Sequence, residues 1–382
     1  MPPCPVCSSQ FVKKNGSVRK DIMTKAGKKT VLVQKYKCQS MHVFRIGNPP
    51  TFDNSFIEYV VYVYLRCLSL NTTIDLVRET YEEDVLSKQL ILDFIERVAD
   101  KLPTIDEIDA IFLPKRSGYV ALDGVWFSFN DEQRVVLCAF DPVSFDIIQA
   151  HWEEDETAEG YERLLTAVIN KMGALEILGA YGDGDNGLMF SLKKLLPHVP
   201  FQLCVFHKEL RMGEVVPVKS VGRSKQMTVQ QKYDIREFQY LFRAVIYANS
   251  KEESAQALAT LGAYVKKNPQ ERFQKAYRSL VRNFMYTLTH FDHPGMLRDN
   301  NLLECFNGIL KPRLKLMKSF KKKENLNRYL KLFLLEFRFR PLRESSFKHR
   351  RGQTPLQLGD VYLPKYYNFI RFLRQRFNLD FS

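Results

Sequence analysis

The chain has 382 residues, 45% of them apolar and 26% charged, and its formal net charge at pH 7 is +14. This length allows two or three domains with a large core, and this composition excludes a disordered chain and a miniprotein that depends on disulfides. No stretch has the ~18 consecutive apolar residues of a membrane span, and the start MPPCPVCSSQ lacks the basic and apolar regions of a signal peptide, so we expect an intracellular protein without a membrane partner.

Residues 1–47 predict a zinc-ribbon-like domain. The segment begins with CPVC and continues to VLVQKYKCQSMHVFRI, so that Cys4, Cys7, Cys38 and His42 supply four soft or borderline ligands from two places in the chain. Such a set suits tetrahedral zinc, and so short a segment has little core of its own without a metal. The alternative is an incidental CxxC motif combined with a buried cysteine.

Residues 48–110 predict a helical domain. Asp53 or Asn54 can cap a first helix, and Ser87 can cap the last one. Three helices with a short turn before the third are compatible with a helix-turn-helix DNA-binding domain, whose final helix enters a major groove. Because residues 82–84 are acidic and the third helix also carries acids, a plain helical bundle is the alternative.

Residues 115–208 change to the period of strands. Three apolar runs, GYVALDGVWFSF, QRVVLCAFDPV and FDIIQAHWEEDE, are separated by turn signals and predict an antiparallel meander. A helix, a buried strand, a second helix and a strand that runs into a third helix follow them. The order βββαβαβα is that of an α/β, RNase H-like catalytic core, of which these residues are the first part.

Residues 209–298 are largely helical and predict a helical insertion domain in that core. The last region, residues 299–382, returns to the core with the helix NNLLECFNGILKPRLKLM, which we expect to end at Pro312. The remainder of this region is basic.

The basic residues gather near this last helix. Residues 311–323 hold seven Lys or Arg and no acid, and FRFRPLRESSFKHRR lies further on. A single run is as readily a solvated surface, but two runs on a chain of high positive charge favour binding to nucleic acid. The residues expected to neutralise DNA phosphates are Lys311, Arg313, Lys315, Lys318, Lys321, Lys322 and Lys323.

Three carboxylates stand out as ligands for hard divalent cations. Asp123 interrupts an otherwise apolar strand, where a charge is costly unless it is paired or bound to a metal. Asp183 ends the strand ILGAY, whereas Asp185 or Asn186 is suited to cap the helix that follows, which favours Asp183 as the ligand.

Glu304 is the third carboxylate. At 100° per residue it shares one side of its helix with Asn301, Asn307 and Lys311. Taken alone, this stripe reads as an ordinary solvated helix face. The alternative for Asp123 is a turn or edge aspartate before Gly124. Together the three acids would suit two-metal phosphodiester chemistry.

These motifs together resemble the D-D-E transposases, namely the Mutator-like group and the related prokaryotic insertion-sequence transposases. The resemblance covers most of the chain and rests on the N-terminal ribbon, ALDGVW, GDGDNGL (D-G-x-x-G-L), CVFHKELR (C-x-x-H) and NNLLECFNGILKPR (N-x-x-E-x-x-N-x-x-x-K), which occur in that order. It departs from the family at Met41 and His42, where a second CxxC is usual, and at Cys305.

The resemblance implies site residues as well as a fold. It implies Asp123, Asp183 and Glu304 as ligands of catalytic Mg²⁺ or Mn²⁺, and it places Cys204 and His207 near the site. His207 would contact a DNA phosphate or steady the active site.

The implied function is that of a DNA transposase. It would bind the terminal repeats of its element and cut and join strands of double-stranded DNA, at the element's ends and at the target, as a homodimer or larger assembly. It would act on the nucleoid in the cytoplasm of a prokaryote, or in the nucleus of a eukaryote. The alternatives are a domesticated transposase that only binds DNA as a regulator, and a structure-specific nuclease on the same fold.

Overall fold

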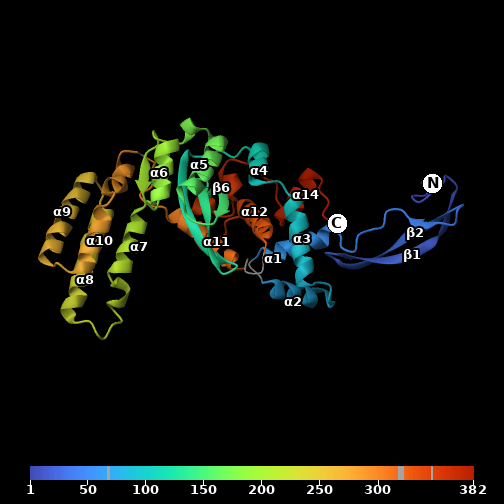
Figure 1. Ribbon diagram of the computed structural model, residues 1–382, viewed down its shortest axis with the longest axis horizontal. Coiled ribbons are helices and arrows are strands. Elements are labelled where there is room, and N and C mark those ends of the chain that lie inside the picture. The colour runs from blue at the N-terminus through green and yellow to red at the C-terminus, as the bar shows by residue number, and fades with distance from the viewer. Residues whose placement is uncertain (67–68, 294, 317–321, 346) are drawn as a thin grey trace. The chain divides into compact units, whose positions relative to one another are not determined.

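The computed structural model describes residues 1–66, 69–293, 295–316, 322–345 and 347–382. They form two compact units, each assembled from separate stretches of the chain (Figure 1). The first unit comprises Met1–Ile108, Ser319–Arg340 and Leu363–Ser382, and the second comprises Asp109–Lys318 and Pro341–Tyr362. No helix among the described residues has both the length and the apolar character needed to cross a membrane.

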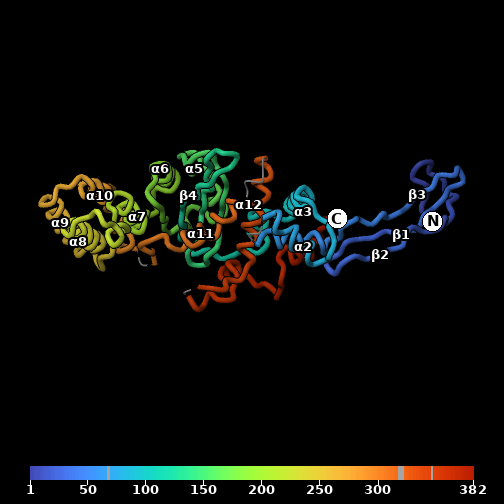
Figure 2. The backbone as a smooth tube through the Cα atoms, turned by 90° about the horizontal axis from the view of Figure 1, so that it is seen from below, coloured from blue at the N-terminus to red at the C-terminus, as the bar shows by residue number. Residues whose placement is uncertain are grey.

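The first unit begins with a three-stranded antiparallel sheet. Its strands are β1 (Val12–Thr24), β2 (Gly27–Cys38) and β3 (Val43–Arg45), in the order β1-β2-β3. Figure 2 shows β1 and β2 as a long hairpin, and most of its side chains are at least partly exposed. The buried cluster at its open end contains only Cys4, Val12, Cys38 and Phe44, with Tyr36 packed against it. So small a core agrees with the expectation that this segment needs a metal.

The rest of the first unit is helical. Its elements are α1 (Asn54–Tyr64), α2 (Leu70–Tyr81), α3 (Lys88–Lys101), the start of α4 (Ile105–Phe112), α12 (Lys323–Phe339) and α14 (Phe369–Phe377). Two predicted caps are confirmed: Asp53 accepts a hydrogen bond from the Phe56 amide at 2.9 Å, and Ser87 accepts one from the Leu90 amide at 3.1 Å.

Helix α3 packs against α1, α2 and α12. Arg328 of α12 binds Asp100 and Glu96 of α3, at 2.8 and 2.9 Å. This packing is that of a helical bundle, and the entry of α3 into a DNA groove stays a prediction. Helix α14 is held to α1 by the fully buried Glu58, which forms ion pairs with Arg371 and Arg374.

The second unit contains a five-stranded mixed sheet. Its strands are β4 (Tyr119–Phe129), β5 (Glu132–Asp141), β6 (Asp146–Glu153), β7 (Gly179–Gly182) and β8 (Phe201–Leu203), in the order β6-β5-β4-β7-β8. The first three strands pair antiparallel, as predicted, and β7 and β8 run parallel to β4. All residues of the short strands β7 and β8 are buried, which is typical of parallel strands.

Helices cover both faces of this sheet. Helices α5 (Ala158–Met172) and α6 (Asn186–Leu195) pack on one face, over a core that includes Val120, Leu122 and Leu137 (Figure 1). Because side chains alternate along a strand, Asp123 and Phe140 belong to the other face. There Phe306 of α11 (Asn301–Leu316) lies with its ring 5.8 Å from that of Phe140.

A layer of helices with its own apolar core follows β8. It consists of α7 (Val205–Val215), α8 (Val229–Ile246), α9 (Lys251–Lys267) and α10 (Glu271–Val281). Phe238 of α8 stacks on Phe273 of α10 at 4.6 Å within a cluster that also contains Met212 and Leu261. Figure 1 shows α8, α9 and α10 side by side. Residues 209–298 are thus largely helical; that they form an insertion domain stays a prediction.

The expectation that the last core helix ends at Pro312 is wrong. Helix α11 continues through Pro312 to Leu316. Proline lacks a backbone N–H, so one helical hydrogen bond is missing, but the packing of α11 on β4 outweighs that loss. The remaining short elements are η1 (Ala174–Glu176), η2 (Val218–Ser220), η3 (Phe284–Phe291), η5 (Lys348–Arg350) and α13 (Pro355–Leu358).

Candidate active site

The register of the central strands aligns two of the predicted acids. Strands β4 and β7 are parallel neighbours, and Ala121 pairs with Tyr181. Asp123 and Asp183 each lie two residues further along the chain, and therefore on the same face of the sheet as that pair. The sequence separates these two acids widely, but the parallel crossover through α5 brings their backbones to the same level.

Asp123 lies on the central strand and is 9% exposed. Its Oδ2 accepts a hydrogen bond from Asn307 Nδ2 at 2.7 Å, and its Oδ1 accepts one from the Gly124 amide at 3.0 Å. Burial, together with the nearby charges of Glu304 and Asp183, raises the pKa of Asp123 to about 7, against the lowering effect of His207. A carboxylate in this position is costly unless a cation compensates it.

Glu304 reaches the same place from α11. Its Oε1 lies 2.9 Å from Nε2 of His207, which comes from the first turn of α7. This hydrogen bond lowers the pKa of Glu304 against the effect of burial. Burial by itself would lower the pKa of His207, but its contacts with Cys204 and Glu304, together with the charge of Asp123, raise it to about 11. The positive imidazolium thus compensates part of the charge of the two acids.

Cys204 joins the elements that carry these groups. It is fully buried, and its amide donates to the Gly182 carbonyl at the end of β7 at 2.8 Å. Its sulfur accepts a hydrogen bond from the amide of Asn300, just before α11, at 3.2 Å. Cys204 therefore fixes the start of α7, and with it His207, relative to the start of α11 and Glu304.

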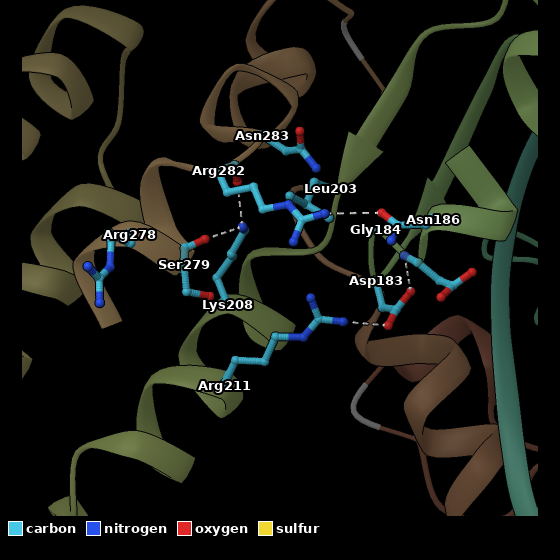
Figure 3. A pocket seen from close by; sticks show the side chains of 11 residues that line it. Asp183, Gly184, Asn186, Leu203, Lys208, Arg211, Arg278, Ser279, Arg282 and Asn283 are labelled. Atoms are coloured by element: carbon cyan, nitrogen blue, oxygen red, sulfur yellow. Dashed lines mark hydrogen bonds and ion pairs between the residues drawn. The ribbon is translucent and has the colours of Figure 1, made fainter. Parts of the chain in front are cut away.

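Asp183 follows β7 in a tight turn. Its Oδ1 accepts a hydrogen bond from the Asp185 amide at 2.8 Å, and its Oδ2 accepts one from Nη2 of Arg211 at 2.9 Å (Figure 3). Between the two acids, Gly184 has a φ of +81°, and a Cβ there would lie 2.5 Å from the Leu203 side chain. The turn therefore requires glycine at this position.

Asp185 serves as the N-cap of α6. Its Oδ1 accepts from the amides of Gly187 and Leu188 at 2.7 and 3.2 Å. These are the unsatisfied donors of the first helical turn. The capping role that the sequence left open between Asp185 and Asn186 thus belongs to Asp185.

The structure brings three of the four predicted catalytic residues into one tight group. Potential ligand atoms of Asp123, His207 and Glu304 all lie within 4.8 Å of one another. Asp183 is outside that group, although it is near enough for its charge to affect the pKa of Asp123. Buried Oδ1 of Asn307 has no hydrogen-bond partner among the described residues. Carboxylate and amide oxygens are the ligands that Mg²⁺ and Mn²⁺ prefer, so these residues fit such a cation.

Three residues at this site had no predicted role. Helical spacing placed Asn307 on the same side of its helix as Glu304, but assigned it no role. Arg211 follows His207 by about one helical turn, so the same spacing could have indicated it. Glu156 accepts hydrogen bonds from Tyr161 and Trp126, and burial and the charges of Asp183 and Asp185 raise its pKa. It comes from a loop, where no periodicity could have revealed it.

The predicted basic run is spread over different environments. Lys311 and Lys315 are exposed on α11, and Lys322 and Lys323 are exposed at the start of α12, in the other unit. Arg313 is buried, 5% exposed, and donates to the Ile309 carbonyl at 3.0 Å. Lys318 and Lys321 lie outside the described residues.

A second candidate metal site lies in the first unit. Ligand atoms of Cys4, Cys7, Cys38 and His42 lie within 4.8 Å of one another. The distances are 3.7 Å between the sulfurs of Cys7 and Cys38, and 3.5 and 3.9 Å from His42 Nδ1 to the sulfurs of Cys38 and Cys4. Tetrahedral zinc, with bonds of about 2.3 Å to sulfur and about 2.0 Å to nitrogen, separates its ligand atoms by roughly 3.5–3.8 Å. The four side chains therefore fit zinc, with His42 as the fourth ligand.

We expect zinc to copurify with the protein and Cys7→Ser to lose it. Because the four ligands surround almost the whole core of this segment, loss of the metal should unfold residues 1–47 locally. Elemental analysis measures the zinc, and limited proteolysis detects the unfolding. Cys305→Ser, at an exposed cysteine in the other unit, is the control. Unchanged zinc content in both Cys7→Ser and His42→Ala would contradict this ligand set.

Comparisons with known proteins agree with one family. The sequence model described as "Transposase, Mutator family" matches residues 7–339. No curated protein matches the chain significantly. Six chains of solved structures match. One of them belongs to a cryoEM structure of the simian T-cell lymphotropic virus intasome in complex with PP2A regulatory subunit B56 gamma; it is 8% identical over 50% of this chain and 69% of that chain, with a TM-score of 0.20. Two folds with so low a TM-score share too little to support an inference.

Proposed function

Because the chain belongs to the Mutator family of transposases, we propose that it cuts the ends of a mobile DNA element and joins them to target DNA with a D-D-E active site. The proposed site consists of Asp123, Asp183 and Glu304, with His207 beside them. The proposed fold of the catalytic unit is RNase H-like. The strand order β6-β5-β4-β7-β8, with the first three strands antiparallel and the last two parallel to β4, supports that proposal.

One observation carries the proposal. Three polar side chains from three separate elements, Asp123 of β4, His207 of α7 and Glu304 of α11, converge on one face of the sheet. Asp183, just after β7, is near enough for its charge to raise the pKa of Asp123. Burying several acids together costs free energy, since each opposes ionisation of the others. A protein that only binds DNA gains nothing from this arrangement, whereas a metal-dependent nuclease or strand transferase requires it.

The residues of the chain would divide the work at this site. Divalent Mg²⁺ or Mn²⁺, when bound, activates the attacking oxygen of water or of a DNA 3′-OH and stabilises the leaving oxygen. Asp123 on β4 and Glu304 on α11 would hold the metal, and Asp183 would add a ligand from the end of the neighbouring strand β7. Asn307 orients Asp123 through their 2.7 Å hydrogen bond. His207 orients Glu304 in the same manner, at 2.9 Å.

DNA recognition is proposed for other parts of the chain. The zinc-binding segment and the helical domain would bind the terminal repeats, and the exposed lysines of α11 and α12 would neutralise phosphates of double-stranded DNA. Pairing two element ends with one target requires more than one active site, which fits a homodimer or a larger assembly on DNA.

Metal-dependent cleavage of the element's own ends tests the proposal. Purified protein, incubated with duplex DNA that spans an element end, should nick it in Mg²⁺ or Mn²⁺ and join the freed 3′-OH to a target plasmid. Chelation by EDTA should stop both steps, and restored Mg²⁺ should recover them. Cleavage without joining would identify a nuclease instead, and sequence-specific binding without any cleavage would identify a DNA-binding regulator.

A further inference from the structure

A polar cavity borders the proposed active site. It has a volume of about 380 Å³ and lies between the turn after β7 on one side and helices α7 and α10 on the other. Asp183 and Asn186 line it from the turn, Lys208 and Arg211 from α7, and Arg278 and Arg282 from the end of α10 (Figure 3). Among the residues that line it, Leu203 is the one large apolar side chain.

The charge of this cavity favours an anion. Its lining contains four cationic and two acidic side chains. Of the acids, Asp183 is paired with Arg211, and Asp185 is engaged by the amides that begin α6. Arg278 and Arg282 are exposed at the rim. Guanidinium groups match the geometry of phosphate oxygens and can bind them in pairs. A site for an apolar small molecule would be lined mainly by hydrophobic side chains, which this cavity lacks.

The cavity wall is held in place by a buried lysine. Lys208 is 5% exposed, and its Nζ donates to the carbonyls of Ser279 and Arg282 at 2.7 and 2.8 Å. These carbonyls belong to the C-terminal end of α10, so Lys208 fixes the place where Arg278 and Arg282 leave the helix. Across the cavity, Nη2 of Arg282 lies 3.3 Å from Oδ1 of Asn186, at the start of α6. The cationic groups are thus positioned before any ligand binds.

We propose that this cavity binds backbone phosphates of the DNA strand that enters the active site. Asp183 belongs both to the cavity and to the proposed metal site, so a phosphate here is a close neighbour of the one that is cut. Arg278 and Arg282 contact the phosphates, and Lys208 holds these two arginines in position. The identity of the strand rests on the proposed function; the affinity of the cavity for DNA phosphate does not.

The test compares two variants that remove the same charge. Arg278→Ala/Arg282→Ala empties the rim, whereas Lys266→Ala/Lys275→Ala removes two exposed lysines from α9 and α10 outside the cavity. Affinity of the full chain is measured by fluorescence anisotropy, without divalent metal, for a short duplex with a single-stranded thymidine extension. We expect the arginine variant to bind about tenfold more weakly at low salt. The slope of the logarithm of its binding constant against the logarithm of salt concentration should become shallower by about 0.7 for each phosphate that it no longer neutralises. The lysine variant should retain most of the affinity. Thermal melting shows that both variants are folded.

DNA with an uncharged backbone in its single-stranded extension makes the test specific for phosphate. The same DNA with uncharged methylphosphonates in its extension should bind wild-type protein more weakly than normal DNA does. The arginine variant should bind both DNAs about equally, because it lacks the two rim arginines that contact these phosphates. Equal losses for the wild type and the arginine variant would overturn the proposal, as would equal losses for the arginine and lysine variants. If inorganic phosphate raises the melting temperature of the wild type alone while both proteins bind DNA equally, the cavity takes a free phosphate and the DNA assignment is wrong.

This outcome is separable from that of the proposed function. If the protein never cuts DNA while methylphosphonates weaken binding of the wild type and not of the arginine variant, this result refutes the proposed catalysis and retains the cavity as a DNA site. A protein that cuts and joins DNA but shows no such difference refutes the cavity alone.

Discussion

Asp123→Asn and Glu304→Gln should each reduce the rate of DNA cleavage by about 10³-fold, the scale expected when one preorganised electrostatic group is lost from an active site. Both changes keep the size of the side chain and remove only its charge. Asp123 is buried beside Glu304, and its charge there is only partly compensated by His207. A neutral amide at this position therefore removes the cost of burying that charge. We therefore expect Asp123→Asn to melt at the same temperature as the wild type, or higher, when no metal is present.

Single-turnover cleavage of end-containing DNA at saturating Mg²⁺ measures this effect, and thermal melting with and without Mg²⁺ measures its cause. Mg²⁺ should raise the melting temperature of the wild type but not that of either variant. Glu159→Gln, at an exposed acid in the first turn of α5, is the control and should cut DNA normally. Full cleavage by either active-site variant would refute the assignment of these acids, even if the chain proves to be a transposase.

The order of strands and helices in the second unit could be predicted from the sequence because each element has a local signal. The antiparallel meander follows from three β-branched and aromatic runs separated by turns, and the caps at Asp53 and Ser87 follow from residue types that accept amide hydrogen bonds. Asp123 stood out because a charge inside an apolar strand is costly, and this signal needs no knowledge of its partners.

Partnerships between distant segments could not be predicted in this way. Nothing in the local pattern of α12 or α14 indicates that they pack with the N-terminal helices, because the ion pairs of Glu58 and Arg328 join residues far apart in the chain. The salt bridge from Arg211 to Asp183 is of the same kind. Pro312 misled the prediction because propensity describes the average cost of a proline, whereas tertiary packing of α11 on the sheet outweighs it.

The two aspartates of the turn after β7 should separate cleanly by mutation. Asp183→Asn removes a charge next to the proposed metal site and should slow cleavage by about 10²- to 10³-fold. It also breaks the ion pair with Arg211, but this pair is partly exposed, at 21% for Asp183 and 43% for Arg211. An exposed pair contributes little, so we expect a loss of no more than about 1 kcal/mol in the free energy of unfolding.

Asp185 should show the opposite pattern. Its Oδ1 caps α6, and asparagine caps helices about as well as aspartate, so Asp185→Asn should change neither stability nor cleavage greatly. Asp185→Ala removes the cap and should lower the free energy of unfolding by about 1 kcal/mol while cleavage persists. Chemical denaturation and single-turnover cleavage, measured on all three variants, check both residues. If Asp185→Asn abolished cleavage and Asp183→Asn spared it, the acid that the turn aims at the metal would be Asp185, and Arg211 would then be pairing with a structural carboxylate.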